Sequence, residues 1–138
     1  MDTAIRYFTR SKKGNTEKLA ARIARATGLE ALDVTNDLTE KADRLFLVNA
    51  MYAANIDGEV KAFLTRNRDK IGEIVNFNTS ASGRSTLPLV KTVADELGIP
   101  VSEKEFHCAA SWIFINKGLP GEADYERAEK FAVEMLAE

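Results

Sequence analysis

The sequence has 138 residues, of which 45% are apolar and 29% charged, with a formal net charge of -2. This length predicts a single domain over residues 1–138, which buries about two-thirds of the surface of its unfolded chain. The near-neutral charge argues against a nucleic-acid-binding surface, and no apolar run is long enough for a membrane span. The single cysteine, Cys108, excludes an intramolecular disulfide and leads us to expect a reducing, cytoplasmic setting.

Strand-like and helix-like segments alternate along the first half of the sequence. An aromatic and β-branched run, Ala4 to Thr9, predicts the first strand, and the helix that follows ends at Gly28. A second strand is expected near Leu29 to Val34. The third, Arg44 to Asn49, has a continuous apolar core that predicts burial on both faces. Between these two strands we expect a weakly defined helix.

The second half continues this alternation. A helix that Asp57 caps is expected to run to about Asn67. The elements expected after it are a fourth strand, a third helix, a fifth strand in one or two pieces and a final helix, at Glu73 to Asn78, Leu89 to Leu97, Val101 to Cys108 with Trp112 to Ile115, and Pro120 onward. The alternation predicts parallel strands joined by right-handed crossovers, and therefore an α/β three-layer sandwich. Ligands bind such sheets outside the carboxyl ends of the strands, where the loops after strands one, three and four converge.

The loop between the first strand and the first helix has the composition of a phosphate site. It offers the hydroxyls of Ser11 and Thr16, the amide of Asn15, the charge of Lys13 and the small Gly14. N–H groups at the start of a helix have no intrahelical partner and lie at the positive end of the helix dipole. One interpretation is therefore a cradle for a phosphomonoester. The other is an ordinary turn with Asn15 or Thr16 as the N-cap.

Four segments in chain order carry motifs that occur together in one protein family. They are Ser11 to Ala20, Tyr52 to Asp57, Phe77 to Gly83, and Phe106 to Cys108 with Lys117 to Pro120. These segments resemble the phosphate loop, two further strand loops and the C-terminal segment of short proteins of the flavodoxin family. The family's phosphate loop reads Ser/Thr-x-Thr-Gly-Asn-Thr, which the sequence matches at Ser11 and at Gly14 to Thr16. An alternative alignment uses Thr9 as the first hydroxyl.

The resemblance implies a flavodoxin-like three-layer α/β/α sandwich with a five-stranded parallel sheet, and non-covalent binding of FMN. The implied FMN-binding residues are Thr9, Ser11, Lys13, Gly14, Asn15, Thr16, Ala50, Met51, Tyr52, Ala53, Asn55, Thr79, Ser80, Ala81, Ser82 and Gly83. Tyr52 is expected beside the isoalloxazine ring, where an electron-rich face disfavours the anionic reduced flavin and lowers its reduction potential. The alternative is that Tyr52 packs on its own helix.

The resemblance leaves three functions open. The first is an electron carrier between a reductase and an acceptor, which requires no catalytic side chain. The second is a small FMN-dependent NAD(P)H:quinone-type reductase. The third is a binding module that has lost FMN, which is motivated by departures from the family pattern at Lys13, Asn49-Ala50 and Ala109-Ala110. We favour the carrier, with redox proteins as partners, no nucleic acid, no membrane, and a monomer or weak dimer.

Other chemistry-bearing residues are assigned less specific positions. Cys108 is expected in the core, and His107 beside it at a partly exposed strand end, because adjacent strand residues face opposite sides. Trp112 is interpreted as part of a split fifth strand, with the cavity mouth or a dimer contact as the alternative. Arg84 follows the Ser82-Gly83 turn and is expected beside the pocket. The sequence has no metal-ligand spacing.

Overall fold

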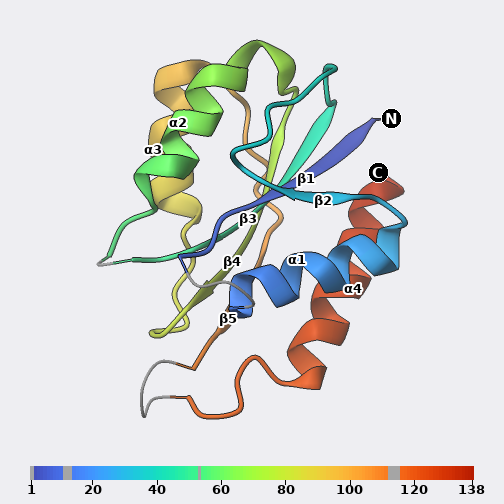
Figure 1. Ribbon diagram of the computed structural model, residues 1–138, viewed down its shortest axis with the longest axis vertical. Helices are drawn as coiled ribbons and strands as arrows, with labels where there is room; N and C mark the ends of the chain where they lie inside the picture. Colours follow the sequence, from blue (N-terminus) through green and yellow to red (C-terminus); the bar gives the residue numbers. More distant parts are fainter. Residues whose placement is uncertain (1, 11–13, 53, 112–115) are drawn as a thin grey trace.

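A five-stranded parallel sheet forms the centre of the molecule. The computed structural model describes residues 2–10, 14–52, 54–111 and 116–138. The strand order is β2-β1-β3-β4-β5, and every neighbouring pair is parallel (Figure 1). The strands are β1 (Thr3–Tyr7), β2 (Ala31–Asp33), β3 (Arg44–Ala50), β4 (Ile74–Ser80) and β5 (Phe106–Ala109).

Two pairs of helices cover the two faces of this sheet. The helices are α1 (Asn15–Thr27), α2 (Gly58–Asn67), α3 (Leu87–Leu97) and α4 (Glu122–Leu136), and the short 3₁₀ helix η1 (Arg68–Lys70) follows α2. In Figure 1, α1 and α4 lie on one face and α2 and α3 on the other. The predicted three-layer α/β/α sandwich with five parallel strands is therefore confirmed.

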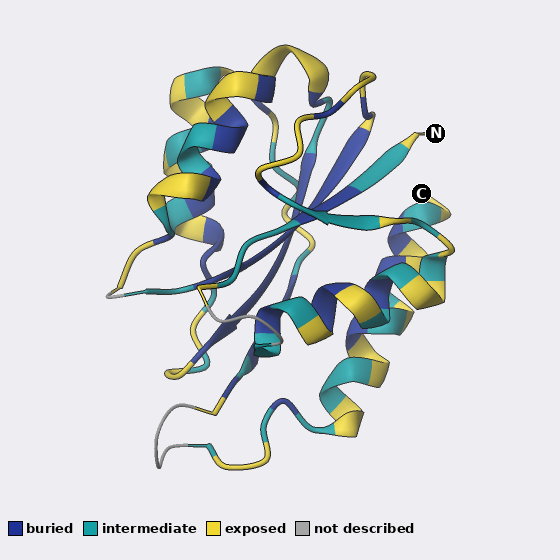
Figure 2. Ribbon diagram, in the orientation of Figure 1, coloured by how far each residue is buried: buried dark blue, intermediate teal, exposed yellow. Residues whose placement is uncertain are grey.

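The central strands are buried along their whole length, as the apolar core of the third strand predicted. Every residue of β3 and β4 is buried, and both strands are dark blue in Figure 2. Successive side chains enter opposite layers: Phe46 packs with α1 and α4, whereas Leu45 and Leu47 pack with α2 and α3. Because helices cover both faces, neither face of these strands contacts water, and the strands do not need to alternate apolar and polar residues.

The predicted helix boundaries are confirmed where a specific capping residue set them. Gly28 ends α1 in the left-handed conformation, with φ 75°, and its N–H donates to the carbonyl of Ala24 at 2.9 Å. Asp57 caps α2 through Oδ1, which accepts from the N–H of Glu59 at 2.9 Å. Gly98 ends α3 with φ 73°.

The prediction of a weakly defined helix between the second and third strands is wrong, because residues 34–43 form turns and a loop. Asp33 directs the chain away from a helix: its Oδ1 accepts from the N–H of Thr35 at 2.9 Å, and its carbonyl from that of Asn36 at 3.0 Å. The loop is then fixed to α2, since the N–H of Leu38 donates to Oδ1 of Asn67 at 2.9 Å.

The strand predicted from Val101 to Cys108 is too long at its start. Val101 forms only an isolated bridge with Ile74, and the chain then leaves the sheet until Phe106. The intervening Glu103 and Lys104 are exposed. Charged side chains are disfavoured at buried positions of a sheet, so this part of the chain does not continue the strand. The continuation at Trp112 to Ile115 lies outside the described residues. The first strand also ends earlier than expected, at Tyr7 rather than Thr9.

Both ends of the chain lie at the edge of the sheet where the strands begin (Figure 1). Arg44, the first residue of β3, contacts both ends: its N–H donates to the carbonyl of Asp2 at 3.2 Å and its guanidinium to that of Met135. The carboxyl ends of the strands lie at the opposite edge. We call these the amino edge and the carboxyl edge.

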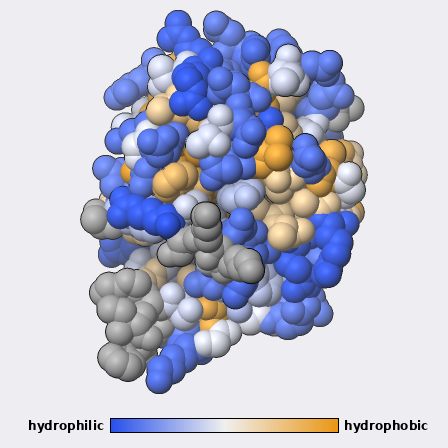
Figure 3. All heavy atoms as spheres, viewed as in Figure 1, coloured by the Kyte–Doolittle hydropathy of each residue, from blue (hydrophilic) through white to orange (hydrophobic). Residues whose placement is uncertain are grey.

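The surface in view is mainly hydrophilic. Polar and charged residues cover most of the face shown in Figure 3, with apolar residues scattered between them. Val133, 47% exposed, is the one exposed large apolar side chain in the described ranges. None of the helices in the described part of the chain has the length and hydropathy to cross a membrane.

Candidate functional site

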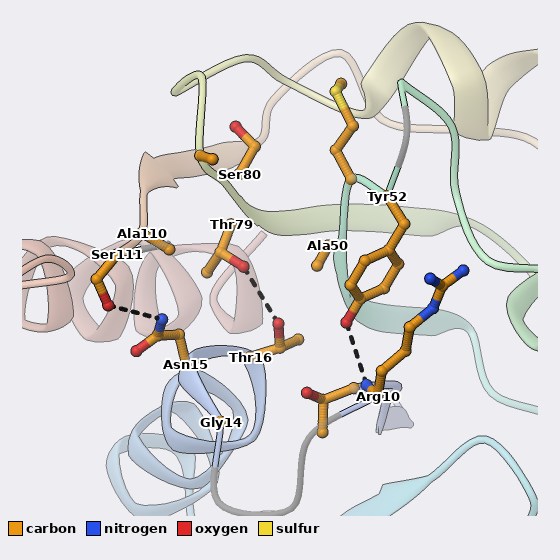
Figure 4. A pocket seen from close by; sticks show the side chains of 13 residues that line it. Arg10, Gly14, Asn15, Thr16, Ala50, Tyr52, Thr79, Ser80, Ala110 and Ser111 are labelled. Carbon is orange, nitrogen blue, oxygen red and sulfur yellow. Dashed lines mark hydrogen bonds between the residues drawn. The ribbon is translucent and has the colours of Figure 1, made fainter. Parts of the chain in front are cut away.

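A cavity of about 700 Å³ opens at the carboxyl edge, between the loops that follow β1, β3, β4 and β5 (Figure 4). It is lined by Thr9, Arg10, Gly14, Asn15, Thr16, Ala50, Met51, Tyr52, Thr79, Ser80, Ala81, Ala110 and Ser111. The chain order of the strands reverses between β1 and β3, and the loops of both reach the cavity. It therefore occupies the topological switch point, where open α/β sheets bind their ligands. Its volume is in the range of small-molecule sites, about 300–1,000 Å³.

The start of α1 forms one end of the cavity. Gly14 is the N-cap, and among the described residues no side chain caps this helix. The alternative in which Asn15 or Thr16 is the N-cap is therefore wrong, because both lie inside the helix. Asn15 and Thr16 bring first-turn backbone to the cavity wall, where helix N–H groups need a partner.

A buried pair of hydroxyl groups joins α1 to β4 beside this end. Oγ1 of Thr16 lies 3.1 Å from Oγ1 of Thr79, and both residues are buried. Nearer the surface, Nδ2 of Asn15 donates to Oγ of Ser111 at 3.4 Å. Figure 4 shows these polar groups on the same side of the cavity, so its α1 end is rich in hydrogen-bonding groups.

The turn after β3 forms a different wall. The N–H of Tyr52 donates to the carbonyl of Asn55 at 2.6 Å, and that of Asn55 returns a bond to the carbonyl of Tyr52 at 2.9 Å. Ala54 within this turn has φ 61°, a conformation that L-residues rarely adopt. Ala50, Met51 and Tyr52 line the cavity here, so this wall is mainly apolar.

The turn after β4 is held in place from several directions. The carbonyl of Arg84 accepts from Nδ2 of Asn78 at 3.0 Å and from Oγ of Ser80 at 2.9 Å. Gly83 supplies the positive φ of this turn, 77°, and its carbonyl lies 3.0 Å from Nδ1 of His107. The turn carries Ser82 and Gly83 out of the cavity lining, whereas Ser80 remains in it.

A cluster of four buried polar side chains, Asn49, Asn76, Asn78 and Thr86, supports that turn from beneath. We call it the amide cluster. Nδ2 of Asn49 donates to Oδ1 of Asn76 at 2.8 Å, and the hydroxyl of Thr86 donates to Oδ1 of Asn49 at 2.7 Å. Thr86 also receives a bond from Asn76 at 3.1 Å, and its N–H donates to Oδ1 of Asn78 at 3.0 Å. The cluster therefore connects β3 and β4 with Thr86, the residue that directly precedes α3.

The structure brings most of the predicted site residues to this one cavity. Those that line it are Thr9, Gly14, Asn15, Thr16, Ala50, Met51, Tyr52, Thr79, Ser80 and Ala81. Asn55, Ser82 and Gly83 do not line it, because they complete the turns that present its walls. Ser11, Lys13 and Ala53 lie outside the described residues. The FMN-binding roles of all these residues stay predictions.

Three lining residues were not predicted: Arg10, Ala110 and Ser111. The last two follow β5, whose place next to β4 brings its carboxyl end to the same edge of the sheet. A predicted parallel sheet contains that information, since all carboxyl ends share one edge. Arg10 had no comparable signal, because its position depends on contacts with residues more than forty positions away.

The departures from the family pattern at Asn49-Ala50 and Ala109-Ala110 cause no backbone strain in this chain. The non-glycine residues with positive φ in the described ranges are Ala54 and Asn116, so Asn49, Ala50, Ala109 and Ala110 have ordinary conformations. Asn116 tolerates its φ of 56° better than most residues, and its Nδ2 donates to the carbonyl of Ala81 at 2.7 Å.

Cys108 is a core residue, as predicted. It is buried against the α1 and α4 layer, and this burial raises the pKa of its thiol to about 11. The thiol therefore stays protonated near neutral pH and is a poor nucleophile. The neighbouring His107 is exposed on the opposite side of β5. The two side chains do not form a catalytic pair.

No protein-family model matches this sequence, and no curated protein does. Solved structures do match its fold. Flavodoxin 1 from Bacillus cereus is 17% identical, with coverage of 98% of this chain and 96% of that one and a TM-score of 0.67. A flavodoxin from the domain Archaea is 11% identical, with coverages of 99% and 97% and a TM-score of 0.77.

A third similar structure is a short-chain flavodoxin associated with a non-canonical PDU bacterial microcompartment. It is 17% identical, with coverages of 99% and 98% and a TM-score of 0.71. At these identities the likeness shows the fold alone. The flavodoxin-like fold that the four motifs implied is therefore confirmed.

Proposed function

We propose that this chain, built on the flavodoxin fold, binds FMN non-covalently in the cavity and carries electrons between redox proteins. One observation carries the proposal. The start of α1, which no described side chain caps, opens into the same cavity as the apolar wall formed by Ala50, Met51 and Tyr52. A helix start suits a phosphate, and an apolar wall suits an isoalloxazine ring.

The α1 end would hold the phosphate. Backbone N–H groups of the first turn donate to phosphate oxygens, and the positive end of the helix dipole favours their charge. The hydroxyl of Thr16 and the amide of Asn15 lie at the cavity wall beside these groups. The contact of Thr16 with Thr79 fixes the helix start against β4 and so limits the reorganisation that binding requires.

The opposite part would hold the ring. Ala50 and Ala81 have small side chains that leave room for a flat ligand, and Tyr52 presents an aromatic wall. Bound FMN would supply the redox chemistry. The protein would orient it and exclude water from one side of it. No carboxylate, imidazole or thiol is among the described lining residues, which suits a carrier that needs no acid or base of its own.

A titration of the purified protein with FMN, followed by flavin fluorescence, tests the proposal. We expect saturable one-to-one quenching, weakened by at least about tenfold by Thr16→Val or Asn15→Ala, because hydrogen bonds to a charged group contribute about 1.5–3 kcal/mol. Riboflavin, which lacks the phosphate, should bind more weakly, and neither substitution should change its affinity. Thr92→Val, on the exposed surface of α3, is the matched control. Absence of binding at FMN concentrations up to about 100 μM would exclude the flavoprotein proposal.

The holoprotein also distinguishes a carrier from a reductase. A carrier accepts electrons from a partner reductase and does not oxidise NAD(P)H by itself. We therefore expect no stoichiometric NAD(P)H oxidation when the holoprotein is mixed with NAD(P)H and a quinone. Rapid turnover in that mixture would instead assign the small reductase function.

A further inference from the structure

Among the described residues that line the cavity, Arg10 is the one with a charged side chain. Its Cζ lies 4.3 Å from the centre of the Tyr52 ring, in a cation–π contact. Its backbone N–H donates to the hydroxyl of Tyr52 at 3.1 Å. In Figure 4 the ring lies between the guanidinium of Arg10 and the side chains of Thr16 and Thr79. Arg10 therefore supports the ring on the side away from the α1 end.

Asp57 holds Arg10 in this position. Nε of Arg10 donates to Oδ2 of Asp57 at 2.9 Å, and the other carboxylate oxygen caps α2. The side chain of Arg10 is 60% exposed, but that of Asp57 is only 13% exposed. The better-buried carboxylate thus anchors the more exposed cation to a fixed element. A continuous set of contacts runs from α2 through Asp57 and Arg10 to Tyr52 at the cavity.

We infer that Arg10, anchored by Asp57, is a positioning residue for Tyr52. The same pair of charges sets the ratio of the cavity's affinities for reduced and oxidised FMN. The inference rests on the proposed function. Reduced FMN gains negative charge, so a nearby cation stabilises it and a nearby carboxylate destabilises it. Arg10 contacts the ring that lines the cavity, whereas Asp57 reaches that ring only through Arg10. The guanidinium thus offsets the effect expected of the tyrosine ring, which favours oxidised FMN.

The two charges predict effects of opposite sign. Arg10→Gln removes the cation and leaves the carboxylate of Asp57 unneutralised, so binding of reduced FMN weakens relative to oxidised FMN. Asp57→Asn leaves the cation unneutralised, so binding of reduced FMN strengthens. Asparagine is as good an N-cap as aspartate, so the second variant keeps the start of α2. A role confined to the shape of the wall would move both variants in the same direction.

The experiment compares dissociation constants for oxidised and reduced FMN, measured without oxygen, in wild type and these two variants. We expect the ratio of the two constants to change about threefold in opposite directions, as for a single charge near a well-solvated site. Arg68→Gln is the matched control, because Arg68 pairs with Asp69 on η1, at the amino edge. Its ratio should equal that of wild type. Ratios that shift in the same direction, or that all stay at the wild-type value, would overturn the inference.

A second measurement needs no FMN. In the apoprotein, the amides of Tyr52 and Asn55 bond across their turn, and loss of Arg10 should speed their hydrogen exchange. The Arg68→Gln control should leave the exchange unchanged. Wild type that fails to bind FMN would overturn the proposed function and the charge effect with it. Unchanged exchange in Arg10→Gln would overturn the positioning role, whether or not FMN binds.

Discussion

Ala54 has a backbone conformation that is unfavourable for its residue type. Its φ is 61°, which costs an L-residue about 1–2 kcal/mol, whereas glycine adopts it freely. We expect Ala54→Gly to raise the free energy of unfolding by about 0.5–1 kcal/mol, after the entropic cost of glycine. Urea denaturation of the apoprotein measures this change.

A matched alanine tests whether the conformation is the cause. Ala81 is exposed in a turn and has an ordinary φ, so Ala81→Gly should lower the free energy of unfolding by about 0.5 kcal/mol. Equal destabilisation by the two substitutions would mean that Ala54 has no strain to relieve.

The thiol of Cys108 should be unreactive in the folded protein. Its pKa is raised to about 11 by burial, so the thiolate that reacts is scarce at pH 8. We expect native Cys108 to react with a disulfide reagent at least about 100-fold more slowly than in urea. The raised pKa also means that the free energy of unfolding decreases as the pH rises from about 8.5, the pKa of the thiol in the unfolded chain, toward its folded pKa of about 11. Fast labelling of native protein at pH 8 would contradict the core assignment.

The amide cluster makes the start of α3 depend on the strands beneath it. Thr86 is the N-cap, but its hydroxyl bonds to Asn49 and Asn76 and does not cap the helix. We expect Thr86→Val to lower the free energy of unfolding by about 2 kcal/mol, because it leaves a buried amide oxygen without its donor. Calorimetry or urea denaturation measures the loss.

Thr92→Val on the same helix is the control for the loss of a threonine hydroxyl. Thr92 is exposed and donates to the carbonyl of Pro88, so its replacement should change stability by less than about 0.5 kcal/mol. If both substitutions destabilise the protein equally, the amide cluster does not fix α3.

The elements that could be predicted from the sequence are those with strong local signals. Gly28, Asp57 and Gly98 each set a helix end through their own backbone or side chain, and the structure has all three boundaries as expected. The loop after β2 was mistaken because Asp33 forms side-chain bonds that compete with a helix. Strand β5 was extended too far because Val101 touches the sheet without continuing into a ladder.

For the whole molecule, FMN should act as a stabilising ligand if it binds the folded state alone. At a free concentration of 100 times the dissociation constant, the gain is about 2.7 kcal/mol. For a chain of 138 residues this corresponds to a rise of about 10 °C in the unfolding temperature. Scanning calorimetry with and without FMN measures it. Removal of FMN by dialysis should restore the lower temperature, and an equal rise with riboflavin would contradict a phosphate site at α1.

Much of the cavity could be located from the sequence because topology places the carboxyl ends of parallel strands together. Thr16 and Thr79 are 63 positions apart, yet motif order and sheet topology predicted that both lie at one site. Arg10 could not be found in this way, since its position depends on a salt bridge with Asp57 and on stacking against Tyr52. Such side-chain contacts have no periodic signal in the sequence.

The placement of the chain ends at the amino edge has a consequence for tethering. Arg44 contacts both ends there, and the cavity opens at the opposite edge of the sheet. An enzyme fused to either end by a flexible linker would leave the mouth of the cavity uncovered. Its effective concentration would then be set by the linker, at about the millimolar level for a short one. If the chain carries electrons as we propose, electron exchange with the fused enzyme would become independent of protein concentration and sensitive to linker length.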